Sequence, residues 1–152
     1  MRQILTLLIA VFFLLTNSSW AEYETDQLII TTTDGEIFDL SKEKGKVVLL
    51  VFWASWCTVC KVEMVNLEEF YQEKKDLGLE VLALNMDNKP EPSSKISYKN
   101  AIFDENALSD FKSPPTIPTI YVIGKDGYTN QKLHAGWQIQ IDNVKRIVNS
   151  LL

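Results

Sequence analysis

The strongest hydrophobic pattern in the chain is a pair of apolar runs that flank an amphipathic segment. Residues Val47–Trp53 are apolar at consecutive positions, which is typical of a strand covered on both faces. From Thr58 to about Lys75 apolar residues recur near helical spacing among charged ones, and Gly78 ends this predicted helix. Residues Leu79–Met86 predict the next buried strand. The order predicts a βαβ unit, whose right-handed crossover places the end of the first strand beside the start of the helix.

A β-hairpin is predicted before this unit and a helix near the C-terminus. Residues Gln27–Thr33 and Glu36–Leu40 are short β-prone runs around Asp34-Gly35, a dipeptide that favours a two-residue hairpin turn. Residues Ile139–Leu152 carry their apolar side chains on one stripe, which suits a helix packed on a sheet.

The segment between these elements has weaker patterns. Residues Asn88–Asn100 contain Pro, Ser and Lys without periodicity and predict a surface loop inside the domain. A short strand is expected around Ala101–Phe103 and a short helix near Glu105–Phe111. A second hairpin is expected from Thr119–Ile123 and Tyr128–His134, joined through Lys125-Asp126-Gly127.

The N-terminal residues have the pattern of a secretory signal. Arg2 precedes the apolar run Ile4–Thr16, and a polar stretch then leads to Ala21 at a small-residue cleavage position. The run is shorter than the roughly 20 apolar residues of a membrane-spanning helix, which favours cleavage over a permanent span. We therefore expect a signal peptide over residues 1–21, a domain over residues 22–152 and a periplasmic or otherwise extracytoplasmic location. An uncleaved signal would leave the domain tethered to the membrane.

Composition and charge narrow the possible functions. The 152 residues, 46% of them hydrophobic, fit one globular domain. With 15 Lys+Arg against 20 Asp+Glu, the net charge of −5 gives no basic face for phosphate neutralisation, so nucleic acids are not expected partners. The two cysteines are too few for a disulfide framework or a four-thiolate zinc site.

The candidate chemistry lies in Cys57 and Cys60, where the first buried strand gives way to the helix. Unpaired backbone N–H groups and the helix dipole lower the pKa of a thiol at a helix N-terminus, so Cys57 is the predicted nucleophile. Cys60 lies one turn deeper and should resolve rather than attack. The alternatives are a static bridge or a metal pair, although zinc would find only His134 and carboxylates as further ligands. Lys61 stands where covalent haem attachment needs histidine.

The motif and its surroundings resemble the thioredoxin superfamily. The resemblance is carried by the run Val47–Cys60, which ends in Trp-Cys-Thr-Val-Cys, by Thr116-Ile117-Pro118-Thr119, and by Lys125-Asp126-Gly127. With the signal segment and opening hairpin, the chain is most similar to exported TlpA/ResA/DsbE-type proteins. The resemblance implies an α/β thioredoxin fold with a central mixed β-sheet flanked by helices and an N-terminal β-hairpin addition. It also implies thiol–disulfide exchange that needs no organic cofactor.

The resemblance also assigns roles to further residues. Pro118 aligns with the family's cis-proline, and the backbone of Ile117 would then bind an extended substrate. Glu63 matches a glutamate thought to assist proton transfer near the buried cysteine, the alternative being a solvated helix carboxylate. Trp56 would belong to an exposed apolar rim that contacts partners, unless it only packs. Val59 departs from the family, which usually has proline there, so the reduction potential does not follow from resemblance.

The sequence therefore favours an exported thiol–disulfide oxidoreductase that forms a mixed disulfide on Cys57. We expect a monomeric reductant that is recharged by a membrane thiol donor. Cytochrome c apoproteins and other oxidised cysteine proteins are candidate substrates. The alternative is a non-catalytic carrier of Cu(I) on the two thiolates, although related copper-delivery proteins usually space the cysteines more widely and add a histidine.

Overall fold

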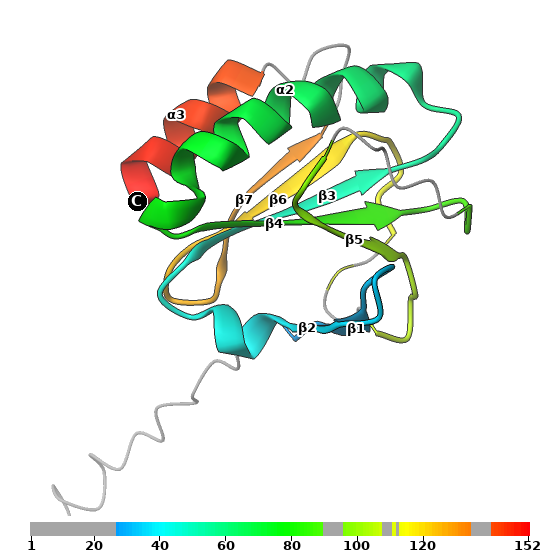
Figure 1. Ribbon diagram of the computed structural model, residues 1–152, viewed down its shortest axis with the longest axis horizontal. Coiled ribbons are helices and arrows are strands. Elements are labelled where there is room, and N and C mark those ends of the chain that lie inside the picture. The colour runs from blue at the N-terminus through cyan, green and yellow to red at the C-terminus, as the bar shows by residue number, and fades with distance from the viewer. Residues whose placement is uncertain (1–26, 90–95, 108–110, 112, 135–140) are drawn as a thin grey trace, which may run out of the picture.

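The fold is built around a five-stranded mixed sheet that separates two helices from a two-stranded hairpin (Figure 1). The computed structural model describes residues 27–89, 96–107, 111, 113–134 and 141–152. The two described α-helices, α2 and α3, cover one face of the sheet, and the hairpin lies under the other, next to a short 3-10 helix (Leu40–Glu43). The strands are β1 (Ile29–Thr31), β2 (Ile37–Asp39), β3 (Val47–Trp53), β4 (Leu79–Asn85), β5 (Lys99–Ile102), β6 (Thr119–Ile123) and β7 (Thr129–His134), and the helices are α2 (Thr58–Lys74) and α3 (Ile141–Leu151).

The predicted βαβ unit forms the centre of the sheet. The strand order is β5-β4-β3-β6-β7, with β3, β4 and β5 parallel and with β6 and β7 antiparallel to their neighbours. Every residue of β3 and β4 is buried, because each strand has a packed layer on both faces. The register pairs Val47 with Leu79 and Trp53 with Asn85, so β3 and β4 end at the same edge. That edge is where α2 begins.

Both predicted hairpins are present. In the first, Gly35 takes a φ of 87° in the turn between β1 and β2, a conformation that glycine adopts without strain. This hairpin is joined to the main sheet at β5 by a bridge between Thr32 and Ala101 and by a 2.7 Å hydrogen bond from the Thr33 N–H to the Asn100 carbonyl. The second hairpin, β6–β7, forms the opposite side of the sheet. The mixed sheet, the helices and the N-terminal hairpin confirm the predicted fold class.

Helix α2 begins at Thr58 as predicted, and its chain reverses at Gly78, whose φ is 100°. Its buried face consists of Cys60, Met64, Leu67 and Phe70. Val62 is one of the apolar residues that recur near helical spacing in the predicted helix, but it is 56% exposed. Helix α3 packs on the same layer with a buried stripe of Val144, Ile147 and Val148.

Two expectations for the middle of the chain differ from the structure: one is wrong at its end, and the other falls partly outside the described residues. The predicted loop over residues 88–100 is wrong at its end, because Tyr98 is buried and β5 already begins at Lys99. The Tyr98 hydroxyl donates to the Met64 carbonyl at 3.1 Å and so ties this segment to α2. Where a helix was expected near residues 105–111, residues 105–107 form a turn, and residues 108–110 lie outside the described residues.

The predictions for the N-terminal segment fall outside the structure. The expected signal peptide, residues 1–21, belongs to the part that is not described. Among the residues that are described, no helix has the length and apolar character needed to cross a membrane.

Candidate active site

The two cysteines form a disulfide at the start of α2. After β3 ends at Trp53, a turn closed by a 3.0 Å bond from the Cys57 N–H to the Ala54 carbonyl leads into the helix. Cys57 is the N-cap residue, and its Sγ accepts the Cys60 N–H at 3.2 Å. The Cys57–Cys60 bond spans this first turn with a Cα–Cα distance of 5.3 Å. The sulfur of Cys57 thus takes the position where capping groups satisfy the free N–H groups of a helix.

The two sulfurs differ in their access to solvent. Cys57 is 8% exposed, whereas Cys60 is completely buried against the helix-side core. A disulfide or thiol of a partner can therefore approach Cys57 but not Cys60. The expectation that Cys57 attacks and Cys60 resolves stays a prediction.

The segment that carries Pro118 leads into β6 at the sheet edge where β3 ends. The Ile117–Pro118 peptide bond is cis, as the resemblance implied. Thr119 pairs with Phe52, one residue before the end of β3. Ile117 is partly buried and packs against the core cluster that contains both cysteines. The fold therefore brings Cys57, Cys60, Ile117 and Pro118 to one edge of the sheet.

Glu63 lies one helical turn after Cys60 and is partly shielded from solvent. Burial raises the pKa of its carboxyl group above the ordinary value of 4.5, and the negative charge of Asp142 on α3 adds to the effect. Its Oε2 atom is buried and has no hydrogen-bond partner among the described residues. A carboxylate in these surroundings is easier to protonate than a solvated one, which suits a proton acceptor near Cys60.

An exposed apolar stripe runs from the disulfide along the outside of α2. Trp56 is 72% exposed, and Val59 and Val62 follow it at intervals of three residues. Exposed large apolar side chains next to a reactive group are typical of a contact surface. The high exposure of Trp56 therefore favours a contact role over the alternative that its side chain only packs against the protein.

Sequence reasoning missed a polar contact that holds the chain just before Cys57. The Asp87 carboxylate accepts the Ser55 backbone N–H at 3.1 Å and the Ser55 hydroxyl at 2.5 Å. These bonds, the hydroxyl bond above all, lower the pKa of Asp87. Ser55 follows β3 and Asp87 follows β4, and these parallel strands end side by side at the same edge of the sheet. Polar residues just after two adjacent parallel strands were the sequence signal that could have revealed the contact.

The described residues include no group of three or more His, Cys, Asp or Glu side chains that could hold a metal ion. His134, considered as a ligand from the sequence, is the last residue of β7 and pairs through its backbone with Thr119.

Comparison with known proteins identifies relatives of the whole domain. The sequence profile of the Redoxin family matches residues 19–145. A thiol-disulfide oxidoreductase ResA from Bacillus cereus is 31% identical over 121 residues, which cover 72% of this chain and 67% of that protein. A thiol:disulfide interchange protein of the thioredoxin family from Chlorobium tepidum TLS superposes with a TM-score of 0.71 at 22% identity, covering 86% of this chain and 99% of that structure. StoA from Bacillus subtilis gives a TM-score of 0.64 at 20% identity, covering 81% of this chain and 96% of that structure. These two structures share the fold.

Proposed function

This chain belongs to the Redoxin family and is a thiol–disulfide oxidoreductase of the thioredoxin superfamily, and we propose that it exchanges electrons with protein disulfides through Cys57, with Cys60 resolving the intermediate. The observation that carries the proposal is the disulfide at the N-terminus of α2, with one sulfur at the helix cap and the other fully buried. Support for an attacking role comes from the cap, because a thiolate there faces backbone N–H groups and the positive end of the helix dipole.

In the first step, the Cys57 thiolate of the reduced protein attacks one sulfur of a substrate disulfide. A bond forms between Cys57 and that sulfur, the substrate S–S bond breaks, and the second substrate sulfur leaves as a thiolate. After reduction, the Cys60 N–H that reaches Cys57 Sγ in the disulfide remains available to stabilise the thiolate. The product of the step is a mixed disulfide.

In the second step, Cys60 loses its proton and attacks Cys57 Sγ. The Cys57–Cys60 disulfide forms, the mixed disulfide breaks, and the remaining substrate sulfur is released as a thiolate, so that two electrons have passed to the substrate. Glu63 is our proposed proton acceptor for Cys60. Its position one turn away on the same helix, its unpartnered buried oxygen and its raised pKa support that role.

Substrate contacts are proposed on both sides of the disulfide. Trp56, with Val59 and Val62 beyond it, offers apolar area to a partner. Ile117, which packs against the core layer that includes both cysteines, would present its backbone groups to an extended substrate segment, and Pro118 would shape that segment's path.

We further propose that the protein acts as an exported, monomeric reductant. An oxidising compartment does not regenerate a dithiol, so a membrane thiol donor would restore the reduced state. Cytochrome c apoproteins and other oxidised cysteine proteins are the proposed substrates. The direction is tested by the equilibrium reduction potential: a value near about −270 mV would support a reductant, and one near about −120 mV would make the protein an oxidant.

The exchange mechanism is tested by trapping. A Cys60→Ser protein should accumulate covalent complexes with oxidised partners, because nothing resolves the mixed disulfide, and dithiothreitol should release them. Cys57→Ser is the matched control and should trap none, since its remaining thiol is buried. Equal trapping by both variants, or by neither, would overturn the assignment of Cys57 as the attacking residue.

A further inference from the structure

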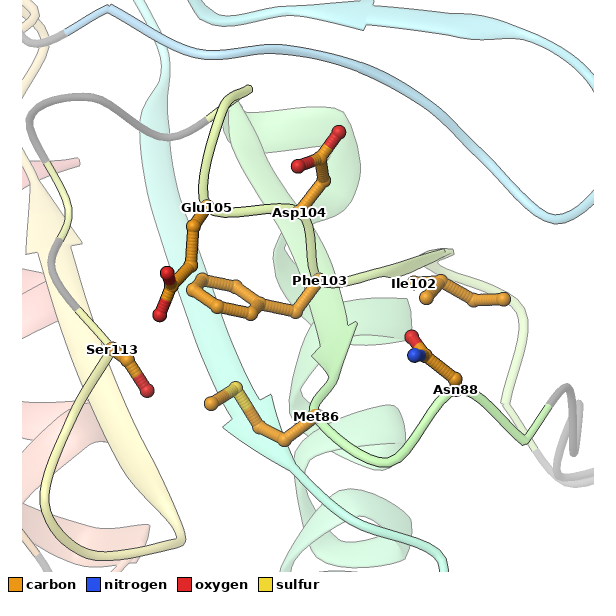
Figure 2. A pocket seen from close by; sticks show the side chains of 7 residues that line it. All are labelled: Met86, Asn88, Ile102, Phe103, Asp104, Glu105 and Ser113. Atoms are coloured by element: carbon orange, nitrogen blue, oxygen red, sulfur yellow. The ribbon is translucent and has the colours of Figure 1, made fainter.

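A pocket of about 530 Å³ lies at the carboxyl ends of β4 and β5, under the sheet edge that carries the redox site. Figure 2 shows its lining side chains. Met86 follows β4, Ile102 and Phe103 come from the end of β5, and Ser113 comes from the segment that leads to Pro118. Nothing in the exchange mechanism described above uses this pocket.

Two of the pocket's lining residues are linked by short stretches of chain to the redox site. The Met86 N–H donates to the Trp53 carbonyl at 2.8 Å, and the four residues from Trp53 to Cys57 span at most about 14 Å. On the other side, Ser113 is five residues before Pro118, a separation of at most about 18 Å. A polypeptide joined to Cys57 can therefore reach the pocket with a side chain a few residues from its own cysteine.

The chemistry of the walls suits a long side chain with a positive end. Met86, Ile102 and Phe103 supply apolar surface, and Glu105 stands at one side. Its carboxylate lies beside the Phe103 ring and faces Ser113 (Figure 2).

The two carboxylates of the pocket differ in their availability. An oxygen of Asp104 already accepts the Asn106 backbone N–H at 2.9 Å and its side-chain amide at 3.1 Å. The Glu105 side chain makes no hydrogen bond or ion pair with any residue that the structure describes. Figure 2 also shows the Asp104 carboxylate pointing away from the Phe103 ring, so Glu105 is the carboxylate placed beside the apolar wall of the pocket.

We propose that this pocket binds a lysine or arginine side chain of the protein substrate, close in sequence to the cysteine that Cys57 attacks. The aliphatic stem would lie along Met86 and Phe103, and the cationic end would pair with Glu105. The inference rests on the proposed function and adds a preference among substrates. The net charge of −5 favours the same class of partner.

The test measures mixed-disulfide formation directly, so the direction of electron flow does not matter. Reduced Cys60→Ser protein is mixed with short peptides whose single cysteine is bonded to 5-thio-2-nitrobenzoate. Cys57 attacks the peptide sulfur, the aryl thiolate leaves, and its colour gives the second-order rate constant. The peptides carry one lysine, leucine or glutamate at two to five residues on either side of the cysteine.

For at least one position we expect lysine peptides to react about threefold to fivefold faster than glutamate peptides, the effect of one exposed ion pair, since Glu105 is exposed. Glu105→Gln should remove that preference and leave the leucine peptides unchanged. Asp76→Asn is the matched control, because it removes one exposed negative charge at the opposite edge of the sheet and should leave the preference intact.

The remaining outcomes separate the two proposals. A reaction faster than that of free cysteine but with no lysine preference at any position, or with a preference that Glu105→Gln leaves intact, overturns the pocket assignment alone. Rates no higher than those of free cysteine at the same pH for every peptide overturn the proposed function together with it.

Discussion

Removing the Asp87 carboxylate should loosen the segment that positions Cys57. Asp87 accepts two hydrogen bonds from Ser55, which lies two residues before Cys57. Ser55 and Asp87 are 32 residues apart in the sequence. The contact therefore fixes the end of β3 to the end of β4. The perturbation is Asp87→Ala, combined with Ser55→Ala in a double-mutant cycle.

The size of the effect follows from the number and exposure of the bonds. A shielded hydrogen bond to a charged group contributes about 1.5–3 kcal/mol. Asp87 is partly exposed, and screening by water reduces this, so we expect Asp87→Ala to lower the free energy of unfolding by about 1–1.5 kcal/mol for the two bonds together. Ser55→Ala keeps the backbone N–H and should cost about half as much. The coupling energy should be about 0.5 kcal/mol.

The pH dependence of the unfolding free energy provides an independent test of the Asp87 contact. The bonds from Ser55 lower the pKa of Asp87 below its ordinary value of 3.8. A carboxyl group with a lowered pKa in the folded state stabilises the fold above the unfolded pKa and loses that contribution as the pH falls through the folded value. The stability difference between wild type and Asp87→Ala should therefore be full at pH 7 and shrink below about pH 4.

The assay pairs urea denaturation with the rate at which Cys57 reacts with a small disulfide. Asp39→Ala is a matched control, because Asp39 accepts the Ser41 N–H at 3.1 Å and its hydroxyl at 2.6 Å, at the end of the hairpin. Both variants should be destabilised, but only Asp87→Ala should slow the exchange, by about threefold. Equal exchange rates in the two variants, or a coupling energy near zero between Asp87 and Ser55, would refute the positioning role.

Two further substitutions test the proposed site. Burial raises the pKa of Glu63, so its contribution to stability is lost as the pH rises, and the ionised carboxylate is unfavourable in the folded protein at pH 7. Glu63→Gln should therefore raise the urea midpoint at pH 7. The same variant should slow resolution by Cys60 about 100-fold, because the proton acceptor is lost. The exposed Glu69→Gln on the same helix should do neither, and a Glu63 variant that resolves at the wild-type rate would exclude proton transfer. Because Trp56 is 72% exposed, Trp56→Ala should change the unfolding free energy by less than about 0.5 kcal/mol but slow reaction with protein substrates; equal slowing with a small disulfide would argue against a contact surface.

The elements that follow from local sequence were predictable. The apolar runs of β3 and β4 reflect packing on both faces, and the reversals at Gly35 and Gly78 follow from residues that accept a positive φ. The placement of Cys57 at the cap of α2 was also predictable, because the strand and the helix meet at that residue.

What the sequence did not reveal depends on contacts between distant segments. Val62 has the same apolar character as Leu67, but only the packing of α2 on the sheet decides which of them is buried. Tyr98 is buried against residues distant in the sequence: its ring packs on Tyr71, and its hydroxyl donates to the Met64 carbonyl, 34 residues away. The sequence of a surface loop does not differ from that of a segment packed on a helix, so the contact with α2 becomes visible only in the folded structure.

The central claim is that Cys57 is made acidic by its place at the start of α2. The most direct measurement is the rate of iodoacetamide alkylation of the Cys60→Ser protein as a function of pH, which titrates the Cys57 thiol alone. We predict a midpoint below about 7.5, because the Cys60 backbone N–H and the helix dipole favour the thiolate. A midpoint near about 8.5, the value of a free cysteine, would contradict the account.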